Sequence, residues 1–242
     1  MRIKCTVSYD GSKFKGWQIQ NNQRTIQGEI QAALKNITQE PIAIHGSGRT
    51  DGKVHGRNQV FHFDCSKELS ENRWHQAINH FLPNDVYVKQ VELVNEEFHS
   101  RYSAKSKEYR YYVNIDDYDP FKTNYIYQLN KPLDLQLMQE GADIFVGEHD
   151  FASFCALDQL GTTIRSIYEF EITQSDGIVC FRVLGNGFRR YMVRHLVGAL
   201  IQVGQKRLPL ERVKQMLESK GEIRCLHKAK PQGLYLQEVH YD

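Results

Sequence analysis

Residues 42–64, IAIHGSGRTDGKVHGRNQVFHFD, hold a glycine-rich loop between two apolar segments, and this arrangement organises the first half of the chain. The flanking segments, IAIH and NQVFHFD, have the composition of strands. Between them, glycines at positions 46, 48, 52 and 56 disfavour a regular helix or strand, since each adds backbone freedom that folding must remove. The stretch therefore predicts a strand, a loop and a second strand, with Asp51 in the loop.

Asp51 itself can be interpreted in two ways. Asp-Gly pairs commonly close tight turns, because Asp tolerates unusual backbone dihedrals and Gly has no side chain to clash. Alternatively, the loop presents the carboxylate, since a desolvated carboxylate held by a cation can act as a nucleophile. The loop alone leaves both interpretations open.

The segments around the loop alternate between strand and helix patterns. Apolar residues at helical spacing predict two helices, the first with Thr25 as its N-cap and the second ended by Pro83. Alternating apolar and polar residues predict the strands. The first half then contains, in order, strand 3–9, helix 25–37, strand 42–45, strand 58–64, helix 72–82 and strand 86–94.

The second half shows a similar order of elements. It contains strand 107–115, helix 133–147, a hairpin over 164–188 that turns at Ser175–Gly177, helix 190–204, a short helix from about Pro209 and strand 233–241. We therefore expect an α+β protein with two halves, residues 1–104 and 105–242, and mostly antiparallel sheets. A cleft between such halves is the natural place for a site.

Composition limits the class of protein. The 242 residues carry 31 basic and 29 acidic side chains, so a net charge of +2 gives no global field that would indicate nucleic acid. Five scattered cysteines without a CxxC pair favour reduced thiols over a disulfide framework. The N-terminal residues lack the apolar run of a signal peptide, and the apolar segment 191–204 is too short to span a bilayer. We expect a soluble, cytoplasmic protein.

Several kinds of site are disfavoured by the sequence. It has no GxxxxGK[ST] phosphate loop and no GxSxG nucleophile motif, and its glycine loop is followed by a strand where a dinucleotide fingerprint needs a helix. His55, His62 and Cys65 suggest zinc, but no second pair of ligands accompanies them. We therefore expect no metal.

Cations near Asp51 are the next candidates. Arg49 lies two residues before it, and Arg194 lies in the most apolar predicted helix. Arginine suits the task of holding a carboxylate, because it keeps its charge and its planar fork matches the two oxygens. The alternative is that Arg190 and Arg194 share a solvated helix face.

Tyrosines dominate the segment KEYRYYV, residues 107–113, and place Tyr109 and Tyr111 on one face of the predicted strand. Such residues commonly belong to a buried core. The alternative is a tyrosine that stacks on a base while arginines contact phosphates, as RNA-binding surfaces do. Basic residues cluster locally at 105–110, 189–194 and 228–230.

Together these segments resemble the TruA family of tRNA pseudouridine synthases over nearly the whole chain. The resemblance rests on motifs in the family's order: YDGSKFKGWQIQ, TIQGEIQAAL, SGRTDGKVHGRNQVFHF, AINHFLPNDVYV, FHSRYSAKSKEYRYYV, GEHDFASFCA, GNGFRRYMVRHLVG and PQGLYLQEVHYD. It implies two ferredoxin-like halves around a central, positively charged cleft, known as the pseudouridine synthase fold. It also implies a homodimer with tRNA reaching across both subunits.

The resemblance further implies an activity and roles for four residues. The expected reaction is isomerisation of uridine to pseudouridine at positions 38, 39 or 40 of the tRNA anticodon stem-loop, without metal or organic cofactor. Asp51 falls on the catalytic aspartate, Arg194 on the arginine that pairs with it, Tyr109 on the tyrosine that packs against the target base, and Arg49 on an arginine that helps to extrude the base.

The chain departs from the family pattern at three places. Gly52-Lys53 stands where Ala-Gly is usual, Ser47 where Ala is usual, and Arg189 where an apolar residue is common. These departures bear on the choice of tRNA position and would suit a divergent paralogue. Two rival hypotheses remain: a non-catalytic RNA-binding module in which Asp51 is only a turn residue, and a metal-free hydrolase with Asp51 as nucleophile.

Overall fold

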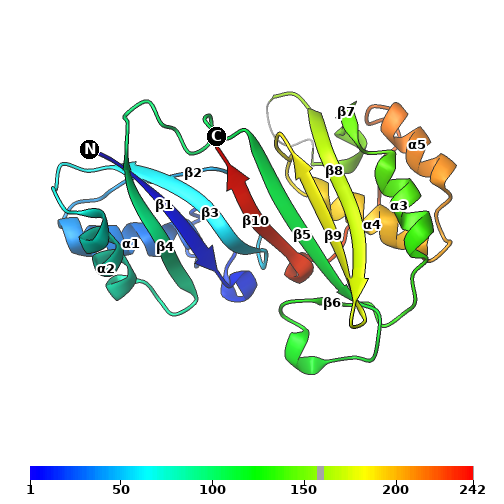
Figure 1. The fold of residues 1–242 in the computed structure, drawn as a ribbon, viewed down its shortest axis with the longest axis horizontal. Helices are drawn as coiled ribbons and strands as arrows, with labels where there is room; N and C mark the ends of the chain where they lie inside the picture. Colours follow the sequence, from blue (N-terminus) through cyan, green and yellow to red (C-terminus); the bar gives the residue numbers. More distant parts are fainter. Residues whose placement is uncertain (157–160, 242) are drawn as a thin grey trace. The chain divides into compact units, whose positions relative to one another are not determined.

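The computed structural model describes residues 1–156 and 161–241 and divides the chain into two compact units (Figure 1). Unit 1 comprises Met1–Lys105 together with the segment from Tyr235 onward, and unit 2 comprises Ser106–Leu234. Unit 2 is thus an insertion between two parts of unit 1. Within the described ranges, no helix is long and apolar enough to cross a membrane.

The sheet of unit 1 is built around β1 (Arg2–Tyr9), whose alternate residues are buried as its sequence pattern predicts. Strand β1 pairs antiparallel with β3 (His55–Asp64) and with β4 (Val86–Val94). On its other edge, β3 pairs antiparallel with the two residues of β2 (His45–Gly46) and parallel with β10 (Leu234–His240). The resulting order, β4-β1-β3-β2, is that of a ferredoxin-like sheet, and β10 joins it by pairing with β3 at His55 and Gly56.

Two helices cover one face of this sheet, α1 (Ile26–Thr38) and α2 (Glu71–Phe81) (Figure 1). Each begins with a hydroxyl N-cap: Thr25 accepts from the Gly28 N–H, as predicted, and Ser70 accepts from the Arg73 N–H. Apolar side chains from helices and strands form one core, whose fully buried aromatic members are Phe14, Trp17, Phe61, Phe63 and Trp74.

Unit 2 has its own antiparallel sheet in the order β5-β9-β8-β7, formed by β5 (Ser106–Asn114), β9 (Ile178–Gly185), β8 (Ile164–Ser175) and β7 (Gly147–Asp150). The short β6 (Tyr127–Gln128) pairs parallel with β5. The predicted hairpin is confirmed, and its turn uses the left-handed region at Asp176 and Gly177 (φ 49° and 69°).

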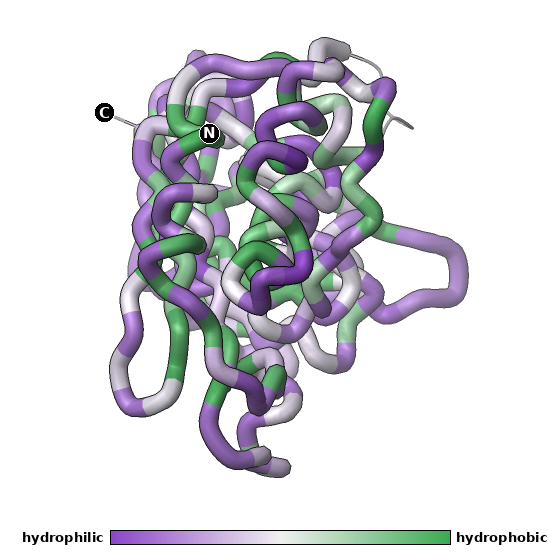
Figure 2. The backbone as a smooth tube through the Cα atoms, turned by 90° about the vertical axis from the view of Figure 1, so that its right-hand side faces the viewer, coloured by the Kyte–Doolittle hydropathy of each residue, from purple (hydrophilic) through white to green (hydrophobic). Residues whose placement is uncertain are grey.

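The helices of unit 2 are α3 (Leu135–Asp143), α4 (Met192–Gly204) and α5 (Leu210–Glu218). Short 3-10 turns complete the two units: η1 (Gly11–Lys13), η2 (Pro120–Lys122), η3 (Ala152–Phe154) and η4 (Pro231–Gly233). Figure 2 looks onto the helical side of unit 2, where hydrophilic and hydrophobic residues alternate along the chain. In contrast, α4 is apolar on nearly all sides and buried, and this burial includes Arg194.

The α+β class and the mostly antiparallel sheets are confirmed, and two elements differ from the prediction. Of the predicted strand 42–45, only His45 joins a strand, because α1 side chains bond the preceding carbonyls: Gln31 Nε2 donates to Ile42 O (2.9 Å) and Gln27 Nε2 to Ile44 O (3.4 Å). The last strand was assigned to the second half, but it pairs with β3 in unit 1.

Candidate active site

The Asp51 loop, residues 47–54, is held in place by main-chain hydrogen bonds at both ends. Its first residue, Ser47, donates its N–H to Val60 O of β3 (2.7 Å). On the other side, the Trp17 N–H donates to Thr50 O (3.0 Å) and the Lys53 N–H donates to Phe14 O (3.2 Å). Asp51 also forms an isolated antiparallel bridge with Gly16. The loop is therefore docked between β3 and the segment 14–17.

Hydrogen bonds among buried polar side chains also hold the loop in place. The Tyr9 hydroxyl and Thr50 Oγ1 are 2.9 Å apart, Ser47 Oγ donates to Gln59 Oε1 (2.5 Å), and Gln59 Nε2 donates to Gly48 O (3.1 Å). Ser47 and Gln59 are fully buried. Burial raises the pKa of Tyr9 above its ordinary value, so its hydroxyl stays protonated. Because buried polar groups that satisfy one another are rigid, the loop has a fixed conformation.

Two glycines, Gly16 and Gly46, allow close contacts around the loop. Gly16 has a φ of +106°, and a Cβ added to it would lie 2.6 Å from Thr50 O. A Cβ added to Gly46 would lie 2.7 Å from the Trp17 ring. Glycine at these positions therefore permits close approach and is required by the docked loop.

Asp51 opens a turn, as its Asp-Gly pair predicts. The Val54 N–H donates to Asp51 O (3.2 Å), which closes the four residues 51–54. The residue in the left-handed region is Lys53 (φ 66°), whereas Gly52 lies outside it. Asp51 is half-buried between two exposed cations, Arg49 and Lys53. Asp51 is thus partly exposed in a loop whose neighbouring residues Ser47 and Thr50 are buried.

The left-handed Lys53 leads to a prediction about stability. Lys53→Gly is expected to leave the free energy of unfolding within about 0.5 kcal/mol of wild type, because relief of the left-handed cost offsets the added freedom of the unfolded chain. Lys53→Val is expected to lose about 1–2 kcal/mol, since a β-branched residue fits this region worst. Urea denaturation measures both, and a Val variant as stable as wild type would contradict the assignment.

His55, at the end of the loop, has a structural role. It is buried, its Nδ1 accepts from the Gly11 N–H (3.1 Å), and its ring stacks on Tyr235 with centroids 4.6 Å apart. His62, considered above as a zinc ligand, forms a hydrogen bond between its Nδ1 and Ser100 Oγ (2.9 Å). In the part of the chain that the structure describes, no cluster of His, Cys, Asp and Glu could hold a metal ion, and all five cysteines are free thiols.

Tyr109 lies on β5 of unit 2. It shares a buried face with Tyr111, as the strand pattern predicts, and is 8% exposed. Its ring packs edge-to-face on Phe188, with centroids 5.2 Å apart. Tyr111 is fully buried and donates its hydroxyl to Lys230 O (2.7 Å), so it belongs to the core. Of the two, only Tyr109 has any exposed surface.

Arg194 lies in the first turn of α4 and is 8% exposed, so it does not share a solvated helix face with the exposed Arg190. Its Nε donates to Ala229 O (2.9 Å), and its own carbonyl accepts from the Ala229 N–H (2.9 Å). These bonds fix the guanidinium of a permanently charged side chain within an apolar helix. The structure describes Asp51 and Arg49 in unit 1 and Tyr109 and Arg194 in unit 2; the pairing of Asp51 with Arg194 stays a prediction.

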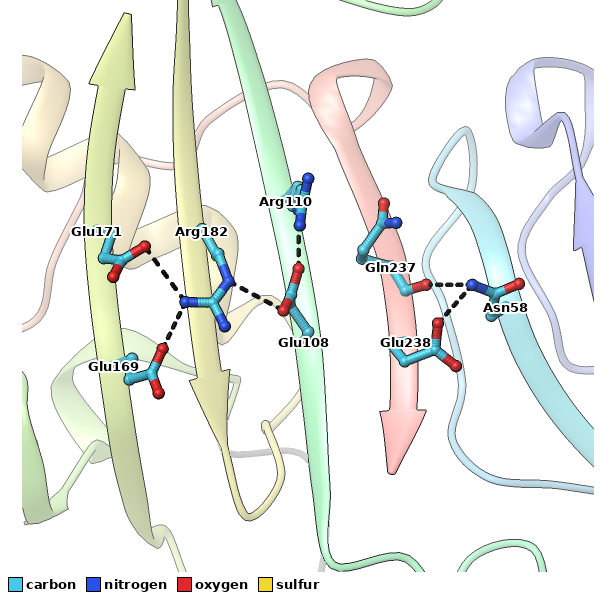
Figure 3. Close-up of polar contacts among 8 residues, drawn as sticks. All are labelled: Asn58, Glu108, Arg110, Glu169, Glu171, Arg182, Gln237 and Glu238. Carbon is cyan, nitrogen blue, oxygen red and sulfur yellow. Dashed lines mark hydrogen bonds and ion pairs between the residues drawn. The ribbon is translucent and has the colours of Figure 1, made fainter. Parts of the chain in front are cut away.

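The opposite face of β5 carries an ion-pair network (Figure 3). Glu108 accepts from Arg110 Nε (2.7 Å) and from Arg182 Nε of β9 (2.9 Å), and Arg182 also contacts Glu169 and Glu171 of β8. Arg110 was part of a predicted basic cluster, but its charge is matched by Glu108. In unit 1, Figure 3 shows Asn58 Nδ2 donating to Gln237 O and to the Glu238 carboxylate of β10.

This network predicts a pH-dependent stability. Burial by itself raises the pKa of Glu108, but the bonds from Arg110 and Arg182 outweigh it and hold that pKa below its ordinary 4.5. A depressed carboxyl pKa stabilises the folded state above pH 4.5, and this contribution is lost as the pH falls through the folded pKa. Glu108→Gln is therefore expected to cost about 1–2 kcal/mol at pH 7 and progressively less below pH 4.5, measured by denaturation at several pH values. A cost independent of pH would contradict this.

Comparison with known proteins identifies the family. A family model described as tRNA pseudouridine synthase matches residues 6–103 and 142–242. The chain belongs to the tRNA pseudouridine synthase family. Both matched segments contain candidate residues, Asp51 and Arg49 in the first and Arg194 in the second, whereas Tyr109 lies between them.

Relatives similar over their whole length support the assignment to the TruA family. The chain is 43% identical over 244 residues to tRNA pseudouridine synthase A 1 of Bacillus cereus, covering 100% of this chain and 99% of that protein. It is 42% identical to tRNA pseudouridine synthase A of a Geobacillus species, covering 100% and 98%, and 41% identical to that of Bacillus subtilis, covering 100% of both. The chain is thus a pseudouridine synthase, which is an isomerase, and its resemblance to the TruA family is confirmed.

Proposed function

We propose that this tRNA pseudouridine synthase isomerises uridine to pseudouridine in the anticodon stem-loop of tRNA, at positions 38, 39 or 40, with Asp51 as the catalytic nucleophile. The observation that best supports this proposal is the Asp51 loop: its backbone is docked on both sides and its Ser47 and Thr50 side chains are buried, while Asp51 itself is partly exposed at the turn. A loop held this firmly can present one carboxylate in a fixed position. The names of the relatives support tRNA as the substrate.

The reaction rearranges bonds within one nucleotide. The N1–C1′ bond breaks, the uracil turns, C5 bonds to C1′, the C5 proton leaves and N1 takes up a proton. Atoms balance without an added reactant, so we propose that no metal or organic cofactor takes part. Asp51 attacks or stabilises C1′ in this proposal, and attack on the base is the alternative.

Arg194 is proposed to keep Asp51 ionised. Its guanidinium is buried, and it cannot lose its proton. A carboxylate beside such a charge favours the ionised form, which is the form that attacks. The bonds between Arg194 and Ala229 would restrict the guanidinium to one orientation.

Tyr109 and Arg49 are proposed to handle the extruded base. Taking a base out of its stack costs a few kcal/mol. Stacking of the base on Tyr109, worth about 1–3 kcal/mol, can offset this cost. Arg49, exposed two residues before Asp51, is suited to occupy the vacated space. The Tyr109 hydroxyl is a candidate to relay the C5 proton.

The resemblance to the TruA family also supports a homodimer in the cytoplasm. In a homodimer, one tRNA would reach across both subunits. Sedimentation of the free protein measures this directly, and a monomer at all concentrations would contradict the homodimer.

The function is tested with unmodified tRNA that carries tritium at uridine C5. Wild-type protein is expected to release tritium, and chemical mapping of pseudouridine is expected to place the product at positions 38–40. Binding without tritium release would favour the non-catalytic RNA-binding hypothesis. Free uracil as product would favour the hydrolase, and pseudouridine elsewhere in the tRNA would overturn the assigned positions.

A further inference from the structure

Three cations gather around one tyrosine ring at the start of α4. Lys228 Nζ lies 4.2 Å from the ring centroid of Tyr191, and the guanidinium carbons of Arg190 and Arg194 lie 4.5 Å and 5.4 Å from it. Arg190 also donates to the Tyr191 hydroxyl (2.6 Å). A ring face attracts each cation, but three like charges at this spacing repel one another.

The backbone holds Lys228 in this position. The Ala229 N–H donates to Arg194 O (2.9 Å), and His227 O is 3.1 Å from His195 Nδ1. One turn further along α4, a Cβ added to Gly198 would lie only 2.6 Å from His227 O. The segment 227–229 therefore lies directly against α4. Lys228 is therefore brought to Tyr191 by a fixed segment, although its side chain is exposed.

The surrounding field is also positive. The N-terminus of a helix carries a partial positive charge, and α4 has neither an acidic residue in its first turn nor a side-chain N-cap. Burial, together with the charges of Lys228, Arg194 and Arg224, lowers the pKa of His195 to about 4 despite its bond to His227 O.

Tyr191 adopts a conformation that serves this cluster. It has a φ of 66°, in the left-handed region, which a bulky aromatic residue rarely occupies. Strain of this kind persists where the surroundings fix the residue, and it is found at ligand sites. At this position the ring lies within 5.4 Å of the charged groups of Arg190, Arg194 and Lys228.

We propose that Arg190, Tyr191 and Lys228 form a binding site for a backbone phosphate of the RNA substrate. The site rests on the proposed function, because it assumes that RNA is the ligand. Arg190 and Lys228 are exposed, so a phosphate on the surface of a folded RNA can reach both. The guanidinium offers two parallel donors to phosphate oxygens, Lys228 adds a point charge, and the first amides of α4 face the same end.

The test measures equilibrium binding of tRNA against salt concentration for Arg190→Gln, Lys228→Gln and the double variant. Removal of one cation that binds a phosphate is expected to reduce the slope of log K against log salt by about 0.7–0.9. The expected loss of affinity at low salt is about 3–10-fold for each single variant and larger for the double variant. Arg190→Lys, which keeps the charge, is expected to restore most of the slope.

The matched control is Lys214→Gln, which removes one exposed positive charge from α5 of the same unit. Its slope is expected to equal that of wild type. The phosphate site would be overturned if the Arg190 and Lys228 variants had the same slope as the control. It would also be overturned if the wild-type protein did not bind tRNA. Since both changed residues are exposed, an unchanged thermal midpoint shows that the variants fold.

The phosphate site and the proposed function can fail separately. Absence of tritium release by wild type contradicts the proposed reaction whatever the slopes are. Tritium release with unchanged slopes contradicts only the phosphate site.

Discussion

Asp51→Asn is expected to reduce tritium release from uridine C5 by about a thousandfold or more while tRNA binding changes little. Asn keeps the shape of the side chain but cannot act as a nucleophile, and loss of a nucleophile typically costs this much or more. The turn should survive, because the Val54 N–H donates to the main-chain oxygen of residue 51. Single-turnover release and filter binding of the same labelled tRNA measure the two effects.

The matched control for Asp51→Asn is Glu68→Gln, which neutralises an exposed carboxylate in the same unit. It is expected to retain wild-type release. Undiminished release by Asp51→Asn would show that another group is the nucleophile. A parallel loss of tRNA binding would instead show that Asp51 acts in substrate affinity.

Gly16→Ala is expected to destabilise the protein by about 2–4 kcal/mol and to reduce the activity of the remaining folded molecules. The added methyl would lie 2.6 Å from Thr50 O at a φ of +106°, so either the segment 14–17 or the Asp51 loop must move. Because the Asp51 bridge is made to Gly16 itself, the carboxylate would move with the loop. Urea denaturation and turnover at saturating tRNA measure the two losses.

Gly52→Ala is the matched control, since it adds the same methyl next to Asp51. Gly52 lies outside the left-handed region, and its nearest neighbour would be Lys15 C at an ordinary 3.5 Å. Its free energy of unfolding is expected to change by less than about 0.5 kcal/mol. Equal destabilisation by the two variants would show that the Gly16 contact does not fix the loop.

Local patterns in the sequence predicted most of the helices and strands. The apolar stripe and Thr25 defined α1, and the alternating residues of 86–94 defined β4. The prediction of a strand over residues 42–45 was wrong except at His45, since two glutamines of α1 donate to the carbonyl oxygens of this segment. Side-chain competition for main-chain groups depends on tertiary packing, which periodicity within one segment cannot report.

The candidate site was predicted only in part. Asp51 could be singled out because its loop is rich in glycine. The Asp-Gly pair predicted a turn there, but the left-handed residue of that turn is Lys53 and not Gly52. The supporting groups Tyr9, Gln59 and Gly16 were missed, because they come from separate segments and meet only in the folded unit. The cluster around Tyr191 was visible only as two separate basic segments, 189–194 and 228–230. Lys228 meets α4 only in the folded unit, because its segment is distant in the sequence.

The position of β10 in unit 1 has a consequence for biosynthesis. The β3 residues His55 and Gly56, which follow the Asp51 loop, pair with Tyr235 and Leu236. All of unit 2 is translated between these partners, so it can fold on the ribosome while the edge of β3 is still open. An open edge invites pairing with other chains. The emerging protein should therefore depend most on chaperones in the interval between translation of β3 and translation of β10.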